Sequence, residues 1–526
     1  MRAQLHEKSI HELRLRWGKE GNQDEDVLEG LQPHSNLQRL EIDGYAGKNL
    51  PLWMLKSNCS LNYEMFLLKN LVELKIGGCK KLESIPVMDG FSSLRPLDIQ
   101  RCHELSTIPD GAFAALTPLQ ELLIRDCHKL DSVSVSELPS LEKLKIVNCD
   151  VSSIGDILAT SRCLKELDLF ELHKLRFIPS LDGLTSLQKL NFVGCGLFKG
   201  PPSGLTSCTA LEELTIHGCH NLISIPQDLK ELRSIVNLNL ANCSKLRSIP
   251  GNPLNYLTSL KNLTIGGFSK EIEEFPGLGS IHLLNTSLES LELFGWEKLN
   301  MLPPQIQHLT ALKKLILSEF DEVETLPEWL GNLSSLKPLR ISDCSRLRCL
   351  PKGLSSGTTL EELGIYDCPN LIFIPEETLD HLTQLKSLRI GPLSTELEEF
   401  PGLSSIHHLH TCLEELWLWG WEKLTQLPHQ IQHLTALKYL SVNKFDGLEV
   451  LPEWLGNLAS LHQLMLGDCK NLKHLPSAGA IRGLSKFLHI QIHCCPLLEE
   501  RCAEENGPEW SRISHFQTIN INYQYV

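Results

Sequence analysis

Apolar residues recur along the chain in one short pattern. Its clearest copy reads Leu71-x-x-Leu74-x-Ile76-x-x-Cys79-x-x-Leu82-x-x-Ile85-Pro86. The first apolar position of the pattern falls at 37, 71, 94, 119, 141, 164, 187, 211, 235, 260, 288, 312, 336, 360, 385, 413, 437, 461 and 487, mostly at intervals of 22 to 28 residues. Because residues two apart share one face of a strand, the Leu-x-Ile step predicts one short strand in each unit.

The length of the unit predicts how the units are arranged. A unit of this size cannot bury its own apolar face, so successive units have to stack and each contacts its neighbours. The Ile-Pro pair ends the apolar run because proline donates no hydrogen bond to a strand ladder. The pattern therefore predicts a curved solenoid with a parallel sheet on its inner side and a return path outside.

The unit resembles the leucine-rich repeat, and the match covers nearly the whole chain. That resemblance implies an α/β leucine-rich repeat solenoid, a horseshoe with a parallel concave sheet and a mostly irregular or short-helical convex side. The Cys position and the Leu-x-x-Ile-Pro ending are similar to the repeat domain of plant nucleotide-binding leucine-rich-repeat disease resistance proteins, especially the coiled-coil class. The stretches 10–17, 27–34 and 50–54 resemble the beginning of that domain.

The resemblance also implies a function and partners. It implies a non-catalytic module of an intracellular immune receptor, which senses a pathogen effector or a modified host protein and contributes to autoinhibition. No Gly-x-x-x-x-Gly-Lys-Ser/Thr loop that would cradle nucleotide phosphates occurs in the sequence. A nucleotide-binding domain would therefore belong to a longer chain, and a stand-alone scaffold remains the alternative.

We expect three regions along the chain. Residues 1–36 would form a repeat start that is truncated or lacks a cap, 37–500 the repeats, and 501–526 a C-terminal capping segment. The cap is expected because Trp510, Ile513, Phe516, Ile519 and Ile521 alternate with polar residues and because terminal repeats need a polar outer face.

The net charge and the hydropathy limit which kinds of partner and which cellular compartment we expect. The formal net charge of −15 argues against a nucleic-acid partner, because no basic excess exists to displace counterions from phosphates. No apolar run approaches the roughly 18 residues of a membrane span, and the beginning of the sequence has no signal-peptide core. We therefore expect a cytoplasmic protein, although five Asn-x-Ser/Thr sequons would suit an extracellular receptor or an inhibitor of wall enzymes.

Candidate chemistry in the sequence is weak. Eleven of the eighteen cysteines occupy the same position of the repeat, where other units carry Phe268, Trp296, Phe320, Trp421 or Phe445. This exchange favours buried thiols, because an aromatic ring cannot replace a disulfide partner or a metal ligand. The group His493, Cys494, Cys495 and Cys502 lacks a paired Cys-x-x-Cys motif. Of the cluster His407, His408 and His410, only one histidine is present at the corresponding positions 125 residues earlier.

A serine hydrolase is the alternative from a different functional class. Gly353-Leu-Ser355-Ser-Gly357 matches a nucleophile-elbow pattern, but it follows a Pro351 turn instead of joining a strand to a helix. We therefore expect no enzyme activity, no cofactor and no metal.

An internal duplication indicates the recognition surface. Residues 271–355 recur as 396–480, and the return-path run 305–313 is identical to 430–438. In contrast, all nine outward strand positions of three paired strands differ, including the change from Glu292 to Trp417. We therefore predict that the concave face binds a protein ligand, and the candidate residues are Phe294, Ile316, Arg340, Tyr366, Trp417, Trp419, Tyr439 and Met465. Of these, Trp417, Trp419, Tyr439 and Met465 should form one patch.

Overall fold

The structure is a computed structural model. It describes residues 5–18, 24–54, 68–109, 111–133, 138–154, 157–200, 202–372, 374–375, 377–393, 403–503, 507–522 and 524–525. The chain divides into two compact units, an N-terminal unit at Met1–Lys261 and a C-terminal unit at Asn262–Val526.

The N-terminal unit contains one five-residue strand in each repeat. These strands are β1 (Glu12–Arg16), β2 (Arg39–Asp43), β3 (Glu73–Gly77), β4 (Pro96–Gln100), β5 (Glu121–Arg125), β6 (Lys143–Val147), β7 (Glu166–Phe170), β8 (Lys189–Val193), β9 (Glu213–His217) and β10 (Asn237–Ala241). Each strand pairs in parallel with the next. Short helices cover parts of the return path, namely η1 (Leu5–Glu7), α1 (Asp24–Glu29), η2 (Leu52–Met54), α2 (Ile157–Thr160), η4 (Leu205–Ser207), η5 (Gln227–Glu231) and η6 (Pro253–Asn255).

The C-terminal unit repeats this design with a helical turn in almost every return path. Its strands are β11 (Asn262–Gly266), β12 (Ser290–Phe294), β13 (Lys314–Ser318), β14 (Pro338–Ser342), β15 (Glu362–Tyr366), β16 (Ser387–Ile390), β17 (Glu415–Trp419), β18 (Tyr439–Asn443), β19 (Gln463–Gly467), β20 (His489–His493), β21 (Thr518–Ile521) and β22 (Gln524–Tyr525). Its helices are η7 (Leu278–Leu284), η8 (Pro304–His308), η9 (Glu328–Asn332), η10 (Lys352–Ser356), α3 (Glu377–Asp380), η11 (Leu403–Leu409), η12 (His429–His433), η13 (Glu453–Asn457), α4 (Ala478–Gly483), α5 (Pro496–Arg501) and α6 (Trp510–Ile513). The strands β11 to β21 are parallel, and β22 runs antiparallel to β21.

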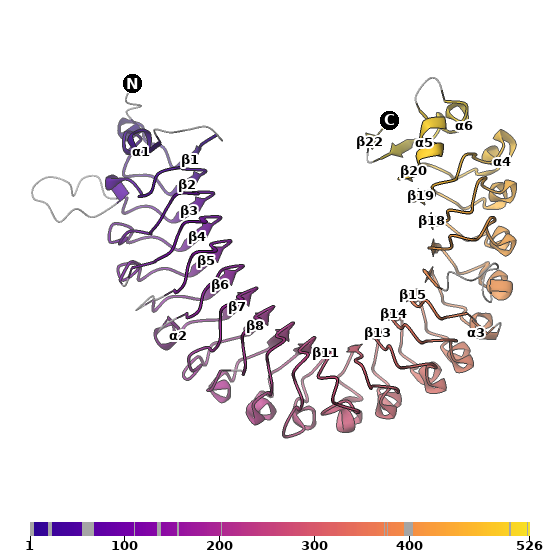
Figure 1. The fold of residues 1–526 in the computed structure, drawn as a ribbon, viewed down its shortest axis with the longest axis horizontal. Coiled ribbons are helices and arrows are strands. Elements are labelled where there is room, and N and C mark those ends of the chain that lie inside the picture. The colour runs from indigo at the N-terminus through magenta and orange to yellow at the C-terminus, as the bar shows by residue number, and fades with distance from the viewer. Residues whose placement is uncertain are drawn as a thin grey trace, which may run out of the picture. The chain divides into compact units, whose positions relative to one another are not determined.

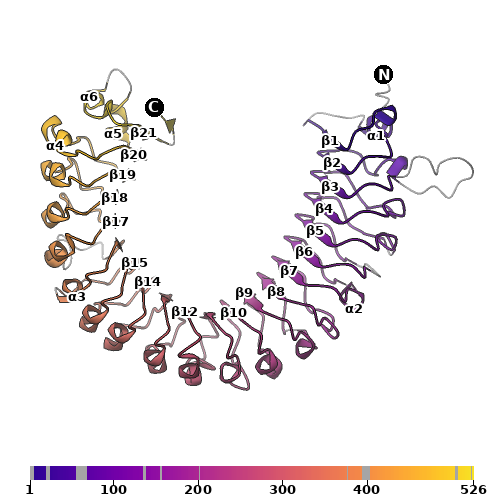
Figure 2. The same ribbon diagram turned by 180° about the vertical axis from the view of Figure 1, so that it is seen from behind.

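Within each unit the strands line the inner side and the return segments lie outside (Figure 1), and Figure 2 shows the same arrangement from behind. The second and fourth residues of the strands face the core, as Leu291 and Leu293 of β12 do with no exposed surface. Their register is in phase, so Leu291 pairs with Leu315 of β13. The structure confirms the predicted solenoid with one parallel strand in each repeat.

The strand of the first repeat is less covered than the others. Leu13 and Leu15 of β1 are half-buried, whereas their neighbours Leu40 and Ile42 in β2 are almost fully buried. In the described residues β1 pairs with β2 alone, so its core-facing side chains are covered by a repeat on one side.

The repeated cysteines form the buried column that the sequence predicts. All eleven thiols at this position are buried and free. Each donates to the carbonyl oxygen two residues before it, for example Cys368 Sγ to Tyr366 O at 3.1 Å and Cys243 Sγ to Ala241 O at 3.5 Å. Burial raises the pKa of Cys243 to about 12, so this thiol stays protonated and unreactive.

A left-handed backbone corner ends most strands. Residues with φ between about 45° and 81° follow the strand in these repeats, and glycine, asparagine or aspartate often occupies the position, as in Gly218, Asn242 and Asp343. These residue types tolerate positive φ better than others. The corner turns the chain so that the following cysteine or aromatic side chain enters the core.

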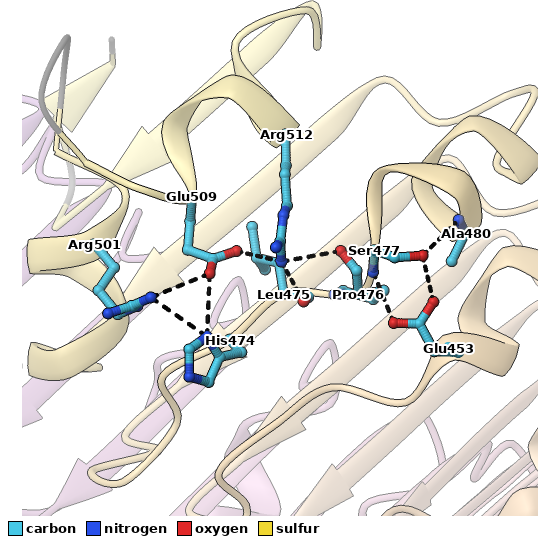
Figure 3. A network of polar contacts seen from close by, with 9 residues as sticks. All are labelled: Glu453, His474, Leu475, Pro476, Ser477, Ala480, Arg501, Glu509 and Arg512. Atoms are coloured by element: carbon cyan, nitrogen blue, oxygen red, sulfur yellow. Dashed lines mark hydrogen bonds and ion pairs between the residues drawn. The ribbon is translucent and has the colours of Figure 1, made fainter.

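The C-terminal end of the chain is fixed by a buried carboxylate (Figure 3). Glu509 is 1 % exposed, and its carboxylate lies 2.6 Å from Arg512, 3.6 Å from Arg501 and 3.2 Å from His474 Nδ1. Arg512 also donates to the carbonyl oxygen of Leu475 at 2.8 Å. These contacts join α5 and α6 to the preceding repeat.

Candidate protein-binding surface

The eight candidate residues all lie at outward positions of strands in the C-terminal unit. Outward positions are the first, third and fifth residues of a strand, because the second and fourth face the core. The candidates are Phe294 in β12, Ile316 in β13, Arg340 in β14, Tyr366 in β15, Trp417 and Trp419 in β17, Tyr439 in β18 and Met465 in β19. They share one sheet face, but they are not all in contact.

Three of the candidates touch one another. The ring centroids of Trp417 and Tyr439 are 4.6 Å apart with the planes tilted by 32°, and the Tyr439 hydroxyl donates to Met465 Sδ at 3.2 Å. Trp419, the most exposed member of the expected patch at 40 %, has no ring contact with these residues among those described. The structure therefore brings three of the four residues into direct contact and places Trp419 two positions along β17.

Arg389 on β16 completes this group, although the sequence analysis did not select it. Its guanidinium lies 5.0 Å from the centre of the Trp417 ring, and its Nη2 lies 3.7 Å from Glu415 Oε2. The strand register pairs Arg389 with Trp417, so an alignment of the repeats would have placed Arg389 beside Trp417. We call Arg389, Trp417, Tyr439 and Met465 the aromatic strip.

Contacts within the aromatic strip hold its side chains in place. A guanidinium over an indole ring and a pair of aromatic rings each contribute on the order of 1 kcal/mol. Burial raises the pKa of the Tyr439 hydroxyl, so it stays a neutral hydrogen-bond donor. Because the rotamers are already restricted, a partner would lose little side-chain entropy by binding here.

A second ordered group lies on β14 and β15. Arg340 binds Glu362 through two hydrogen bonds, at 2.8 and 3.3 Å. The ring of Tyr366 covers Gly364, where a Cβ atom would come within 2.7 Å of the ring. Glycine at that position therefore permits the tyrosine to lie along its own strand.

Phe294 and Ile316 occupy the first strands of this face. Phe294 pairs with Ser318 across β12 and β13, and Ile316 pairs with Glu292. Their strands are separated from the strands of the aromatic strip by β14 and β15. The structure does not bring these two candidates into the aromatic strip.

The inner face of the N-terminal unit has a different character. Its outward residues form a ladder of alternating charge, in which Lys143 lies 3.6 Å from Glu121 and 3.8 Å from Glu166. A second pair, Lys145 and Asp168, lies 3.3 Å apart. These charges compensate one another within the face, whereas the aromatic strip leaves apolar surface open to a partner.

The remaining candidate chemistry does not gather into a site. Ser355 lies in η10, a 3-10 turn that follows Pro351. Among the described residues, no three histidine, cysteine or carboxylate side chains are placed to share a metal ion. None of the described helices is long and apolar enough to cross a membrane.

Comparison with family models identifies the type of repeat. A model described as R13L1/DRL21 LRRs matches residues 1–102 and 430–495. A second model, described as plant disease resistance protein RPS2-like, leucine-rich repeats, matches residues 84–227. The repeats that these two models match are leucine-rich repeats of the plant disease resistance type. This confirms the resemblance to plant disease resistance proteins, whereas the coiled-coil class stays a prediction.

Relatives among characterised proteins carry the same description. The disease resistance protein RGA1 of Solanum bulbocastanum is 31 % identical over 188 residues, which are 34 % of this chain and 18 % of that protein. The disease resistance protein RPS4B of Arabidopsis thaliana is 30 % identical over 207 residues, 33 % of this chain and 17 % of that protein. The leucine-rich repeat chain thus spans about a fifth of the length of the curated relatives it matches.

A solved structure has the same fold. A leucine-rich repeat protein of Leptospira interrogans superposes with a TM-score of 0.53 at 22 % identity, covering 74 % of this chain and 91 % of that one. This similarity concerns the architecture of the leucine-rich repeats alone.

Proposed function

We propose that this chain is the non-catalytic, protein-recognising part of a plant intracellular immune receptor of the coiled-coil class. In this proposal it senses a pathogen effector or a modified host protein in the cytoplasm and contributes to autoinhibition. A nucleotide-binding domain would belong to the longer receptor chain. The relatives support this role, because they are disease resistance proteins much longer than the region they share with this chain.

The aromatic strip is the observation that carries the recognition part of the proposal. Trp and Tyr are enriched among binding hot spots, where truncation costs about 2 kcal/mol or more. Trp417 and Tyr439 lie side by side on the sheet face, and Trp419 is 40 % exposed. A long open sheet face of this kind offers many side chains to a large protein partner and no closed pocket to a small one.

The duplication supplies the variant that tests the strip. We would replace the aromatic residues by their counterparts from the first copy, W417E/W419F/Y439K/M465R, within the full receptor. The first copy already carries these residues on the same backbone, so we expect the Tm to fall by only a few degrees through the loss of the ring contacts. We expect the response to the recognised pathogen to be lost, and partner affinity to fall by more than about tenfold.

A matched control changes outward residues of the other unit. T215N/N239T exchanges two polar side chains on β9 and β10 and should leave recognition unaltered. Full recognition by the W417E/W419F/Y439K/M465R variant would place the binding surface elsewhere and refute this proposal. The proposed autoinhibition is tested separately. We expect that a receptor from which the repeats are removed gives a stronger response in the absence of the pathogen.

A further inference from the structure

A groove on the outer side of the C-terminal unit lies away from the sheet face that carries the aromatic strip. It encloses about 770 Å³ between the segment that follows β11 and the segment that follows β12. The first wall includes Glu273 and Glu274, the second includes Lys298 and Met301, and Phe275 lies at the floor. The interval from Leu260 to Leu288 is 28 residues against the usual 24, and it contains the residues of the first wall.

The floor of the groove is apolar and fixed. Phe275 is 7 % exposed, and its ring packs edge-on against Trp296 with centroids 4.6 Å apart. Trp296 is held in turn by a hydrogen bond of 2.7 Å from its Nε1 to the carbonyl oxygen of Ile272. These contacts hold the Phe275 ring in place at the bottom of the groove.

The rim of the groove combines apolar surface with a net negative charge. Met301 is 63 % exposed, and Pro304 on the same wall is also exposed. Glu273 and Glu274 are exposed, and neither forms an ion pair within the described part of the chain. Lys298 is the single cation among the groove residues, so two carboxylates face one ammonium group.

We propose that this groove binds a segment of a protein partner that carries an apolar side chain next to lysine or arginine. The apolar side chain would cover Phe275 and Met301, and the cation would pair with Glu273 or Glu274. A protein segment is favoured over a small molecule because the rim is exposed, and small-molecule sites bury most of their ligand. This surface is additional to the proposed recognition face and does not depend on it.

The second copy of the duplicated block changes the rim while it keeps the scaffold. Asn300, Met301 and Pro304 correspond to Thr425, Gln426 and His429, whereas Lys298 corresponds to Lys423. The apolar rim therefore belongs to the first copy alone. It also means that the fold tolerates polar residues at these positions, which provides a conservative variant.

A defined peptide tests the proposal on the full chain. We would label the methionine methyl groups with ¹³C, assign Met301 from the signal lost in M301Q, and titrate acetyl-Lys-Leu-Lys-amide into the protein. We expect a saturable shift of the Met301 methyl signal at millimolar peptide. The double variant E273Q/E274Q should weaken this binding about three- to tenfold, because each exposed ion pair contributes a modest attraction.

Two control peptides and one variant complete the experiment. Acetyl-Lys-Ser-Lys-amide removes the apolar side chain and acetyl-Glu-Leu-Glu-amide reverses the charge, and both should bind at least several-fold more weakly. N300T/P304H, which retains Met301 as reporter, should also weaken binding. Equal shifts with all three peptides, or no saturable shift with acetyl-Lys-Leu-Lys-amide, would overturn the proposal. The W417E/W419F/Y439K/M465R variant should bind the peptide normally, so the two proposals fail independently.

Discussion

The carboxylate of Glu509 lies 2.6 Å from the guanidinium of Arg512 although Glu509 itself is almost completely buried. The two residues are three positions apart, so both lie in or next to α6. Arg512 also contacts residues that are far from it in the sequence. Its guanidinium donates to the carbonyl oxygens of Leu475 and Pro476, so these contacts join α6 to residues that precede Arg512 by more than thirty positions.

The first prediction concerns this carboxylate. E509Q removes the charge that compensates Arg501 and Arg512, and we expect it to destabilise the C-terminal region by about 1–3 kcal/mol. This is less than the roughly 3–5 kcal/mol of a fully buried broken pair, because both arginines are about one-third exposed. Hydrogen exchange should accelerate in α5, α6 and β21 before it does in β12 to β15.

The control for E509Q is E453Q. Glu453 is exposed and binds the backbone and hydroxyl of Ser477 at the start of α4, so its loss should cost less than about 1 kcal/mol. Equal exchange rates in the two variants would show that Glu509 does not hold the C-terminal segment.

The second prediction concerns the left-handed corner at Lys444. This residue has φ of 56° and an exposed side chain, so it bears the strain of positive φ without packing in return. Asparagine adopts this conformation more readily, and we expect K444N to stabilise the protein by about 0.5–1 kcal/mol. Urea denaturation followed by circular dichroism measures the change.

The matched change at a neighbouring corner is D468N. Asp468 has φ of 51°, and aspartate already tolerates that backbone. D468N should therefore leave the free energy of unfolding almost unaltered. A gain at 468 as large as that at 444 would mean that relief of the backbone strain of lysine does not explain the effect.

The third prediction compares two thiols of the buried column. Cys219 Sγ lies 3.7 Å from its nearest carbonyl acceptors, whereas Cys368 Sγ lies 3.1 Å from Tyr366 O. A serine hydroxyl lies closer to its Cβ than a thiol does, so it would miss the acceptors at 219 and approach the acceptor at 368. We expect C219S to cost about 1–3 kcal/mol and C368S to cost less.

Alanine separates hydrogen bonding from volume at these positions. C219A leaves a small space without a buried hydroxyl, so it should be less destabilising than C219S. Urea denaturation of the four variants, C219S, C219A, C368S and C368A, gives the comparison. The explanation fails if serine is tolerated equally at both positions.

The fourth prediction concerns pH. Hydrogen bonds from Lys337 and Lys386, at 2.8 and 2.9 Å, lower the pKa of Glu361 to about 2. Since the folded pKa lies below the unfolded value, this carboxylate contributes stability above about pH 4.5 and loses it as the pH falls toward 2. The difference in stability between the natural chain and E361Q should therefore be larger at pH 6 than at pH 3.5.

The dependence on salt concentration provides a check on that interpretation. The Glu361 side chain is about one-third exposed, so salt should reduce the difference at pH 6. A difference that is independent of both pH and salt would assign the effect of E361Q to something other than the two lysines.

The amino-acid sequence alone determined the repeating architecture. Apolar residues at fixed spacing specify which side chains of each strand enter the core, because strand geometry has a period of two. For the same reason the sequence predicted that Trp417, Tyr439 and Met465 face outward together. The exchange of cysteine with Phe268, Trp296 or Phe320 was sufficient to predict buried, unpaired thiols.

The tertiary structure decided which of these residues meet. Arg389 covers Trp417 from the preceding strand, and Trp419 lies apart from the ring contact of Trp417 with Tyr439. Glu509 becomes the centre of a network with His474 and Arg501. Such contacts join residues in different repeats. They depend on side-chain rotamers and on the position of each return segment. The spacing of apolar residues predicts that the repeats stack and which strand positions face outward. It does not specify the distances between side chains of different repeats.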